Sequence, residues 1–347
     1  MTISACILSV SGPTLTPDEA ALFAERQPWG VILMGRSCVS RGQVQALVDD
    51  IWAALGRACL IFIDQEGGRV ARLKSPEWPA FPSGLSYAEL YKRDEEKGLE
   101  AVWLGHRLIA HELAEMGIHA DCAPVVDLPV PGAHDVIGDR AFGNDPVVVA
   151  KLARAALQGL SDGSVAGVIK HIPGHGRSMA DSHKELPRVT AGDNELSKDF
   201  AAFAELTDAP MAMTAHIAYE AFDPDRAATI SPIMVQEIIR ERIGFDGLLM
   251  TDDLGMEALG GSLSERATAA IEAGCDVLLH CSGFLSDPKD ILSEMREVAE
   301  AAPVLEGEAK RRAQRADDMS TQKKPFEPVE AWAKFYDYFP NLVEAAA

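Results

Sequence analysis

Eight short apolar runs, separated by stretches with helical spacing, are the feature that most limits what this chain can fold into. They occupy residues 5–10, 31–34, 58–63, 118–126, 165–169, 210–215, 248–251 and 276–280. Strands that alternate with helices indicate a parallel sheet, because each helical crossover returns the chain to the same edge. Eight such units predict an α/β protein with a single (β/α)8 TIM barrel over residues 1–303.

The connecting segments carry ordinary helix signals. Asp145 and Pro146 predict an N-cap and a first turn, and Gly163 ends the apolar stripe that follows them. The connection over residues 67–94 is rich in Pro, Gly and aromatic residues, so we interpret it as a functional loop that leads into a helix at 99–116.

A shorter region follows the predicted barrel. Residues 304–347 contain a charged helical stretch at 306–319, a linker at 320–325 and an aromatic segment at 332–339. We expect the aromatic tail to pack on the barrel, with a subunit contact as the alternative.

Charge and cysteine content exclude several function classes. Lys and Arg total 32 against 53 Asp and Glu, a formal charge of −21, which disfavours nucleic acid and anionic membranes as partners. No apolar run is long enough to span a bilayer, and no basic residue precedes the first apolar run as in a signal peptide. The six cysteines show no metal-binding spacing, so we expect reduced thiols in a cytoplasmic protein.

The seventh run ends on two adjacent acids, Asp252 and Asp253, in the stretch GLLMTDDLGM. One interpretation is that either acid caps the next helix. The other is a catalytic carboxylate at the C-terminal end of a barrel strand, where TIM barrels keep their active sites.

Polar residues follow several other runs. They include Asp64, Arg72, Asp127, Arg140, Lys170, His171, His175, Asp181, His183 and His216. Taken singly, Lys170 or Arg140 could be an ion-pair partner and His171 a satisfied core histidine. Because so many ionisable groups at one rim are costly to desolvate, together they predict a site for a polar ligand.

Five segments resemble the successive motifs of the family-3 glycoside hydrolases. They read IDQEGGRVARL, VIGDRAFGNDP, KHIPGHGRSMADSHKELP, MTAHIAY and MTDDLGM, and they extend from about residue 63 to 281. Within that family they are most similar to the single-domain bacterial β-N-acetylhexosaminidases of cell-wall recycling.

The resemblance implies roles for particular residues. It implies Asp252 as nucleophile and His183 as general acid/base, with Asp181 beside it. The implied sugar-binding residues are Asp64, Arg72, Arg140, Lys170 and His171. The sequence departs from the family at Thr251 and Ile172, and at Gly255, where a small hydroxyl residue is frequent.

These roles agree with the chemistry of retaining glycoside cleavage. A carboxylate traps the anomeric centre, and a histidine, which titrates near ~6.5, can serve first as acid and then as base. Asp181 can accept a ring N–H bond from His183 and stabilise its imidazolium form. Gly174 and Gly176 allow the loop to close, and Arg177 and Arg188 add to an expected positive mouth.

The predicted activity is removal of N-acetylglucosamine from 1,6-anhydro-muropeptides, with no metal and no organic cofactor, by a monomer or weak homodimer. The alternatives are a phosphorylase that uses phosphate as acceptor and a metal-dependent hydrolase that uses His171, His175, His183 and Asp252. A non-catalytic sugar-binding module is a further alternative.

Overall fold

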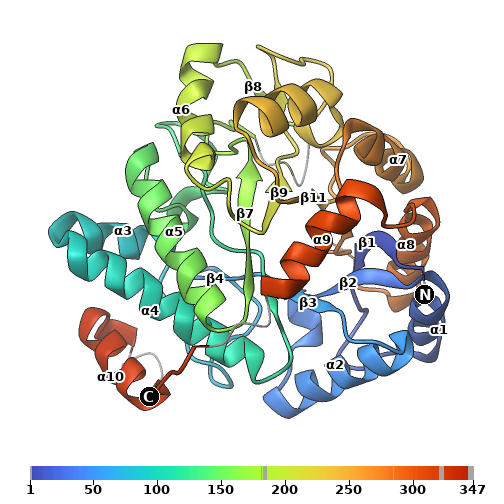
Figure 1. The fold of residues 1–347 in the computed structure, drawn as a ribbon, viewed down its shortest axis with the longest axis horizontal. Coiled ribbons are helices and arrows are strands. Elements are labelled where there is room, and N and C mark those ends of the chain that lie inside the picture. The colour runs from blue at the N-terminus through green and yellow to red at the C-terminus, as the bar shows by residue number, and fades with distance from the viewer. Residues whose placement is uncertain (1, 181, 183–185, 284, 320–323, 343–347) are drawn as a thin grey trace.

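Eight parallel strands close into a barrel in the computed structural model, which describes residues 2–180, 182, 186–283, 285–319 and 324–342. Around the barrel the strands follow the order β1 (Ser4–Leu8), β12 (Val277–His280), β11 (Leu248–Asp253), β9 (Met211–Thr214), β7 (Ala166–Ile172), β6 (Ala120–Asp121), β3 (Leu60–Ile63) and β2 (Pro28–Leu33). Helices surround this barrel (Figure 1). The predicted (β/α)8 fold is therefore confirmed.

Both faces of the strands are buried, which explains their nearly unbroken apolar runs. On β11, Leu248 and Met250 point into the barrel and pack in its interior cluster, whereas Leu249 packs with the surrounding helices. This alternation follows from the two-residue period of a strand. The interior cluster fills the barrel below the strands' C-terminal ends and leaves those ends for polar groups.

The helices connect successive strands along the outside. They are α1 (Pro17–Arg26), α2 (Arg41–Leu55), α3 (Gly84–Arg93), α4 (Glu95–Ala114), α5 (Pro146–Asp162), α6 (Asp193–Ala204), the π-helical η4 (Ile233–Arg242), α7 (Leu263–Ala273) and α8 (Pro288–Ala301). Short 3-10 turns lie at η1 (Gly35–Ser37), η2 (Gly138–Arg140) and η3 (Ala228–Ile230). As predicted, Asp145 caps α5 by accepting from the N–H groups of Val147 and Val148.

Two stretches differ from the sequence-based expectation. The connection over residues 67–94 is not a plain loop, because it contains a β-hairpin of β4 (Gln65–Gly67) and β5 (Val70–Ala71) and then α3. The predicted strand at 118–126 is regular only over β6, and Pro124, which lacks an N–H donor, lies between β6 and a single bridge at Val125.

The N-terminal end of the barrel is covered by α9 (Gly307–Met319), which crosses it in Figure 1. Ala313 and Ala316 of this helix, with Leu305 before it, belong to the barrel's interior cluster. The last helix, α10 (Pro328–Tyr338), lies against α4, where Phe335 is fully buried beside Tyr87. Among the described residues no helix is long and apolar enough to cross a membrane.

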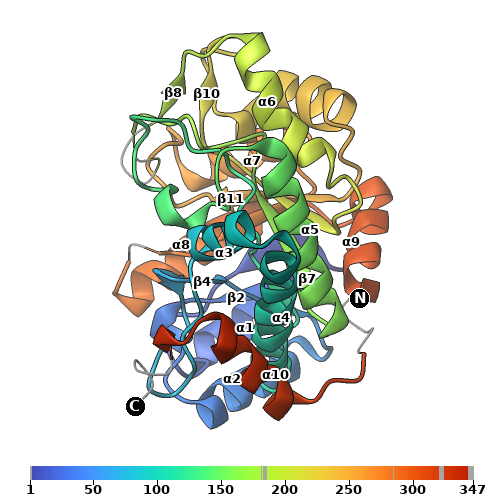
Figure 2. The ribbon, with the colours of Figure 1, turned by 90° about the vertical axis from the view of Figure 1, so that its left-hand side faces the viewer.

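The opposite end carries the longer connections. There β8 (Arg188–Val189) and β10 (Ala218–Tyr219) pair as a small parallel sheet outside the barrel. Figure 2 shows this sheet and β4 on the side of the molecule away from α9. All six cysteines are free thiols, as the sequence predicted.

Candidate active site

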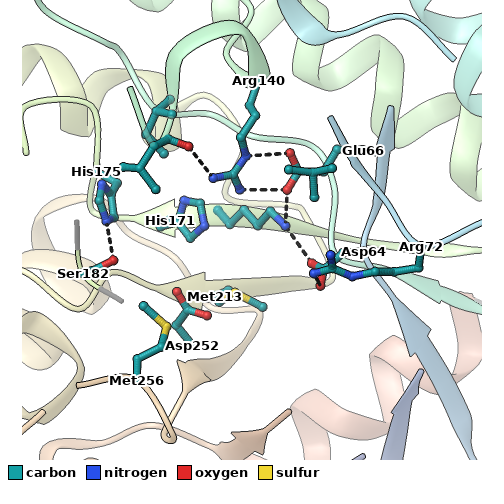
Figure 3. A pocket seen from close by; sticks show the side chains of 14 residues that line it. Asp64, Glu66, Arg72, Arg140, His171, His175, Ser182, Met213, Asp252 and Met256 are labelled. Carbon is teal, nitrogen blue, oxygen red and sulfur yellow. Dashed lines mark hydrogen bonds and ion pairs between the residues drawn. The ribbon is translucent and has the colours of Figure 1, made fainter. Parts of the chain in front are cut away.

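A cavity of about 250 Å³ opens at the C-terminal ends of the strands. Most of its polar lining comes from β7, β11 and the segments after β3. The lining residues are Asp64, Glu66, Val70, Arg72, Val136, Ile137, Arg140, Lys170, His171, His175, Ser182, Met213, Asp252 and Met256. Figure 3 shows Asp252 and Met256 on one side of this cavity, across from Arg140, Glu66 and Asp64.

One wall of the cavity is a continuous ion network. The Lys170 ammonium lies 3.0 Å from Asp64 Oδ1 and 2.6 Å from Glu66 Oε1. Arg140 donates two bonds of 2.8 Å to Glu66, and Arg72 Nη2 donates to Asp64 Oδ2 at 2.9 Å. Three cations thus face two carboxylates, so this wall carries one net positive charge.

The network determines the charge of each member. Burial alone would raise the pKa of Asp64, but the charges of Lys170 and Arg72 and their hydrogen bonds lower it. Burial is overcome in the same way at Glu66, where Arg140 and Lys170 lower the pKa to about 2. Burial would lower the pKa of Lys170, whereas Asp64 and Glu66 raise it. Around neutral pH the wall is therefore fully ionised.

His171 and His175 are held by Asp127, which is completely buried after β6. The His171 ring donates from Nδ1 to Asp127 Oδ2 at 2.6 Å, and the His175 backbone N–H donates to Oδ1 at 2.6 Å. His175 Nε2 lies 3.1 Å from the hydroxyl oxygen of Ser182. Burial, and then the charge of His171, lower the pKa of His175 to about 4. His175 is therefore neutral at physiological pH, and Asp127 orients His171 toward the cavity.

The two acids at the end of β11 have different surroundings. Asp252 lines the cavity and is partly exposed, and its Oδ1 accepts the backbone N–H of Asp253 at 2.8 Å. Asp253 is buried and accepts the N–H groups of Gly255 and Cys281, both at 3.0 Å. The next helix, α7, begins at Leu263 and is capped by Ser262. The helix-cap interpretation of these acids is therefore wrong.

Comparison with known proteins identifies the family of this barrel. The family described as "Glycosyl hydrolase family 3 N terminal domain" matches residues 8–317. The chain belongs to glycosyl hydrolase family 3. This membership agrees with the resemblance inferred from the five motifs.

Family-3 relatives cover most of the chain. A β-hexosaminidase of Bordetella avium is 40% identical over 281 residues, which is 80% of each chain, and one of Alkalilimnicola ehrlichii is 38% identical over 312 residues, 88% of this chain and 87% of that one. A solved structure of NagZ from Neisseria gonorrhoeae in complex with N-trifluoroacetyl-D-glucosamine is 28% identical, with a TM-score of 0.83. It covers 100% of this chain and 99% of that one.

The family-3 fold brings most of the predicted site residues together. Six of them line the same cavity: Asp64, Arg72, Arg140, Lys170, His171 and Asp252. The predicted acid/base pair, Asp181 and His183, lies outside the described residues. Lys170 and Arg140 form ion pairs, and they line the cavity as well, so the two interpretations of these residues are compatible.

Some residues were missed or misplaced by sequence reasoning. Glu66 lines the cavity, and its spacing of two residues from Asp64 was the signal, because a strand places such residues on one face. Arg177, expected at a positive mouth, pairs instead with Asp199 at 2.6 Å, and Arg188 donates to the carbonyl of Pro224. Neither arginine is among the described lining residues.

Proposed function

We propose that this family-3 protein is a retaining exo-β-N-acetylglucosaminidase that removes N-acetylglucosamine from 1,6-anhydro-muropeptides during cell-wall recycling. The β-hexosaminidase names of its relatives and the sugar analogue bound to the gonococcal NagZ support the choice of sugar. The observation that carries the proposal is the position of Asp252, whose carboxylate shares a cavity with the net positive wall around Lys170.

In the first half-reaction, an oxygen of Asp252 forms a bond to the anomeric carbon while the bond from that carbon to the departing oxygen breaks. The electron pair of the broken bond goes to the departing oxygen, which takes a proton from the imidazolium of His183. Asp181 accepts the other ring N–H and stabilises the charged ring. The roles of these two residues rest on the family motif.

In the second half-reaction, a water oxygen attacks the same carbon from the face that the leaving group vacated. His183, now neutral, takes a proton from this water, and the bond to Asp252 breaks with its electrons returning to the carboxylate. Glycoside and water become free sugar and alcohol. Two inversions leave the β-configuration unchanged.

The ion network supplies directional contacts to the sugar. Asp64 is ionised, so it acts only as an acceptor and can bind sugar hydroxyl protons. Lys170 and Arg72 fix that carboxylate from two sides and keep N–H groups near the cavity. These charges are ordered before the sugar arrives, so binding requires little reorganisation. His171, fixed by Asp127, adds a ring donor or acceptor.

The proposed function also has consequences for the substrate, the cellular compartment and the oligomeric state. The substrate is a small carbohydrate with an anionic peptide stem, and the free cysteines suit the reducing cytoplasm. The proposal needs no metal, no organic cofactor and no nucleic acid, and the working unit is a monomer or weak homodimer.

Covalent trapping tests the reaction directly. A 5-fluoro derivative of N-acetylglucosaminyl fluoride retains the 2-acetamido group, and its ring fluorine slows both steps by destabilising positive charge at the anomeric centre. Because fluoride leaves easily, the glycosyl enzyme should accumulate. We expect a mass increase of one sugar that maps to Asp252 after proteolysis and is absent from Asp252→Asn. Labelling at any other residue contradicts the assignment of the nucleophile.

The experiment also includes a matched control variant and turnover assays with added phosphate or with a strong chelator. Asp290→Asn, at an exposed position of α8, should trap the sugar like the wild type. Turnover that depends on added phosphate would favour the phosphorylase, and turnover lost in a strong chelator would favour the metal-dependent hydrolase. We expect neither.

A further inference from the structure

His280, the last residue of β12, is completely buried between two carboxylates. Its Nδ1 lies 3.3 Å from Asp253 Oδ1, and its Nε2 lies 3.1 Å from Glu294 Oε2 on α8. The hydroxyl oxygen of Ser282 is 3.0 Å from the same Nε2. The resemblance to family 3 assigns no role to this histidine, and it does not line the cavity.

The surroundings of His280 favour its charged form. An ionised carboxylate has no proton to donate, so an oxygen at 3.1 or 3.3 Å is favourable only when the facing ring nitrogen is protonated. Burial would lower the pKa of His280, but hydrogen bonds and charges from Asp253 and Glu294 raise it to about 9. Burial would likewise raise the pKa of Asp253, which His280 and two backbone N–H groups hold at about 2.

Other charged or titratable groups near this pair come from three further segments. Arg266 of α7 acts on both Asp253 and Glu294, and it donates to the carbonyls of Leu254 and Met256. Arg36, after β2, also acts on Asp253. His216, after β9, faces the Asp253 backbone carbonyl at 3.0 Å. The imidazolium is the cation that contacts the Asp253 carboxylate directly.

Asp253 connects this ion pair to the cavity. Its carboxylate is bound by His280 and by the N–H groups of Cys281 and Gly255, so it joins the ends of β11 and β12. Its own backbone N–H donates to Asp252 Oδ1 at 2.8 Å. A shift of Asp253 therefore moves the hydrogen-bond donor that orients the Asp252 carboxylate.

Gly255 leaves the space that the imidazole occupies. A Cβ atom added at Gly255 would lie 3.2 Å from Asp253 Oδ1 and 3.3 Å from His280 Cε1, closer than ordinary contact. The absence of a side chain and the presence of the buried imidazole are thus two parts of one local arrangement.

We propose that His280 is a positioning residue, a buried cation clamped between Asp253 and Glu294 that holds the end of β11 so that Asp252 faces the anomeric carbon. This inference rests on the proposed role of Asp252 as nucleophile. It adds a requirement outside the cavity: the reaction needs the ring in its charged form.

Kinetics with 2,4-dinitrophenyl N-acetyl-β-glucosaminide test this role. Dinitrophenolate leaves without protonation, so loss of the His183 proton does not limit the first step. The variants are His280→Gln, which retains polar atoms without the charge, and Glu294→Gln, which removes one carboxylate at a partly exposed position. The matched control is Glu300→Gln, which removes a surface carboxylate of α8 that pairs with Arg26.

We expect His280→Gln to lower kcat on the order of 10- to 100-fold at neutral pH with KM nearly unchanged, because a misoriented nucleophile slows chemistry more than binding. In the wild type, activity should fall as the pH rises through 9. In Glu294→Gln this alkaline limit should move down by about 1 pH unit, because one stabilising charge is gone. Glu300→Gln should match the wild type.

A second readout does not depend on activity. Ring nitrogen NMR of histidine-labelled protein, assigned by comparison with His280→Gln, should show one imidazolium that persists well above pH 7 and loses its proton earlier in Glu294→Gln. If His280→Gln fails to fold, the alkaline limit and the imidazolium signal of Glu294→Gln still test the role of His280.

The outcomes separate the two proposals. An active wild type whose kcat and alkaline limit are unchanged in both variants overturns the role of His280 and leaves the function intact. A neutral ring at pH 7 also overturns it. A wild type that releases no dinitrophenol overturns the proposed function itself.

Discussion

The two ends of this barrel are built from the same eight strands, yet they bury opposite kinds of group. At the N-terminal end, α9 covers the barrel and adds Ala313 and Ala316 to the apolar interior. At the C-terminal end, Lys170 and its carboxylate partners are buried as ions around a cavity. Apolar burial stabilises the fold directly, whereas buried ions are tolerated only when each is paired. The comparison separates positions that maintain the fold from positions that perform chemistry.

The largest expected effect concerns function alone. Asp252→Asn should lower kcat on the order of 10⁴-fold or more with an aryl N-acetyl-β-glucosaminide, because it replaces the proposed nucleophile with an amide, which is a poor nucleophile. The melting temperature should change little, since Asp252 is partly exposed and forms no described ion pair. Parallel rate and unfolding measurements check this. A variant that unfolds at room temperature would place Asp252 among the structural residues.

Lys170→Met should affect both stability and catalysis. It removes the cation shared by Asp64 and Glu66 and leaves a buried and a largely buried carboxylate with fewer partners, at a cost of about 3–5 kcal/mol in unfolding free energy. KM should rise as well. Urea unfolding and steady-state kinetics measure the two effects. The control is Lys151→Met, whose solvent-exposed ion pair with Glu95 should contribute little to stability.

A substitution at the N-terminal end of the barrel should lower stability without lowering kcat, the reverse of the effect expected at Asp252. Leu305→Ala removes a buried side chain from the interior cluster and should cost about 2–4 kcal/mol in unfolding free energy. The kcat of the folded protein should stay unchanged, because the cavity is at the other end of the strands. A large loss of kcat at full folding would show that the ends are coupled.

The last expected effect is the pH dependence of stability at His280. Its pKa rises from the ordinary ~6.5 to about 9 on folding, so the stabilisation is fully present below pH ~6.5 and is lost as the pH rises through 9. The unfolding free energies of wild type and His280→Gln should therefore differ more at pH 6 than at pH 10. Denaturant titrations at both pH values measure this. A constant difference would contradict a charged ring.

Much of the fold could be predicted, because its signals are local. Each strand is an apolar run set by side chains two residues apart, and the N-cap of α5 depends only on Asp145 and the residues after it. The hairpin of β4 and β5 and the helix α3 were missed, since short strands with Gly and Pro nearby have weak patterns. The role of α9 was also missed, because a charged helix with two buried alanines does not indicate what it covers.

The sequence predicted which residues gather at the candidate site better than it predicted how they pair with one another. The residues that follow each strand could be collected at one rim, because parallel strands bring their C-terminal ends together. Which of them pair could not be deduced: Arg177 and Arg188 were expected at the mouth and bind elsewhere. Asp253 was considered only as a helix cap, and nothing near it in the sequence indicated the imidazolium 27 positions away.

The sequence by itself determined the eightfold alternation, the polar strand ends and the family, since these depend on residue type and spacing along the chain. The tertiary structure alone decided that Lys170 meets Asp64 across 106 positions and that His280 lies between two carboxylates. The physical reason is that charge and orientation depend on neighbours in space. Those neighbours come from different strands and helices, and only closure of the barrel brings them within bonding distance.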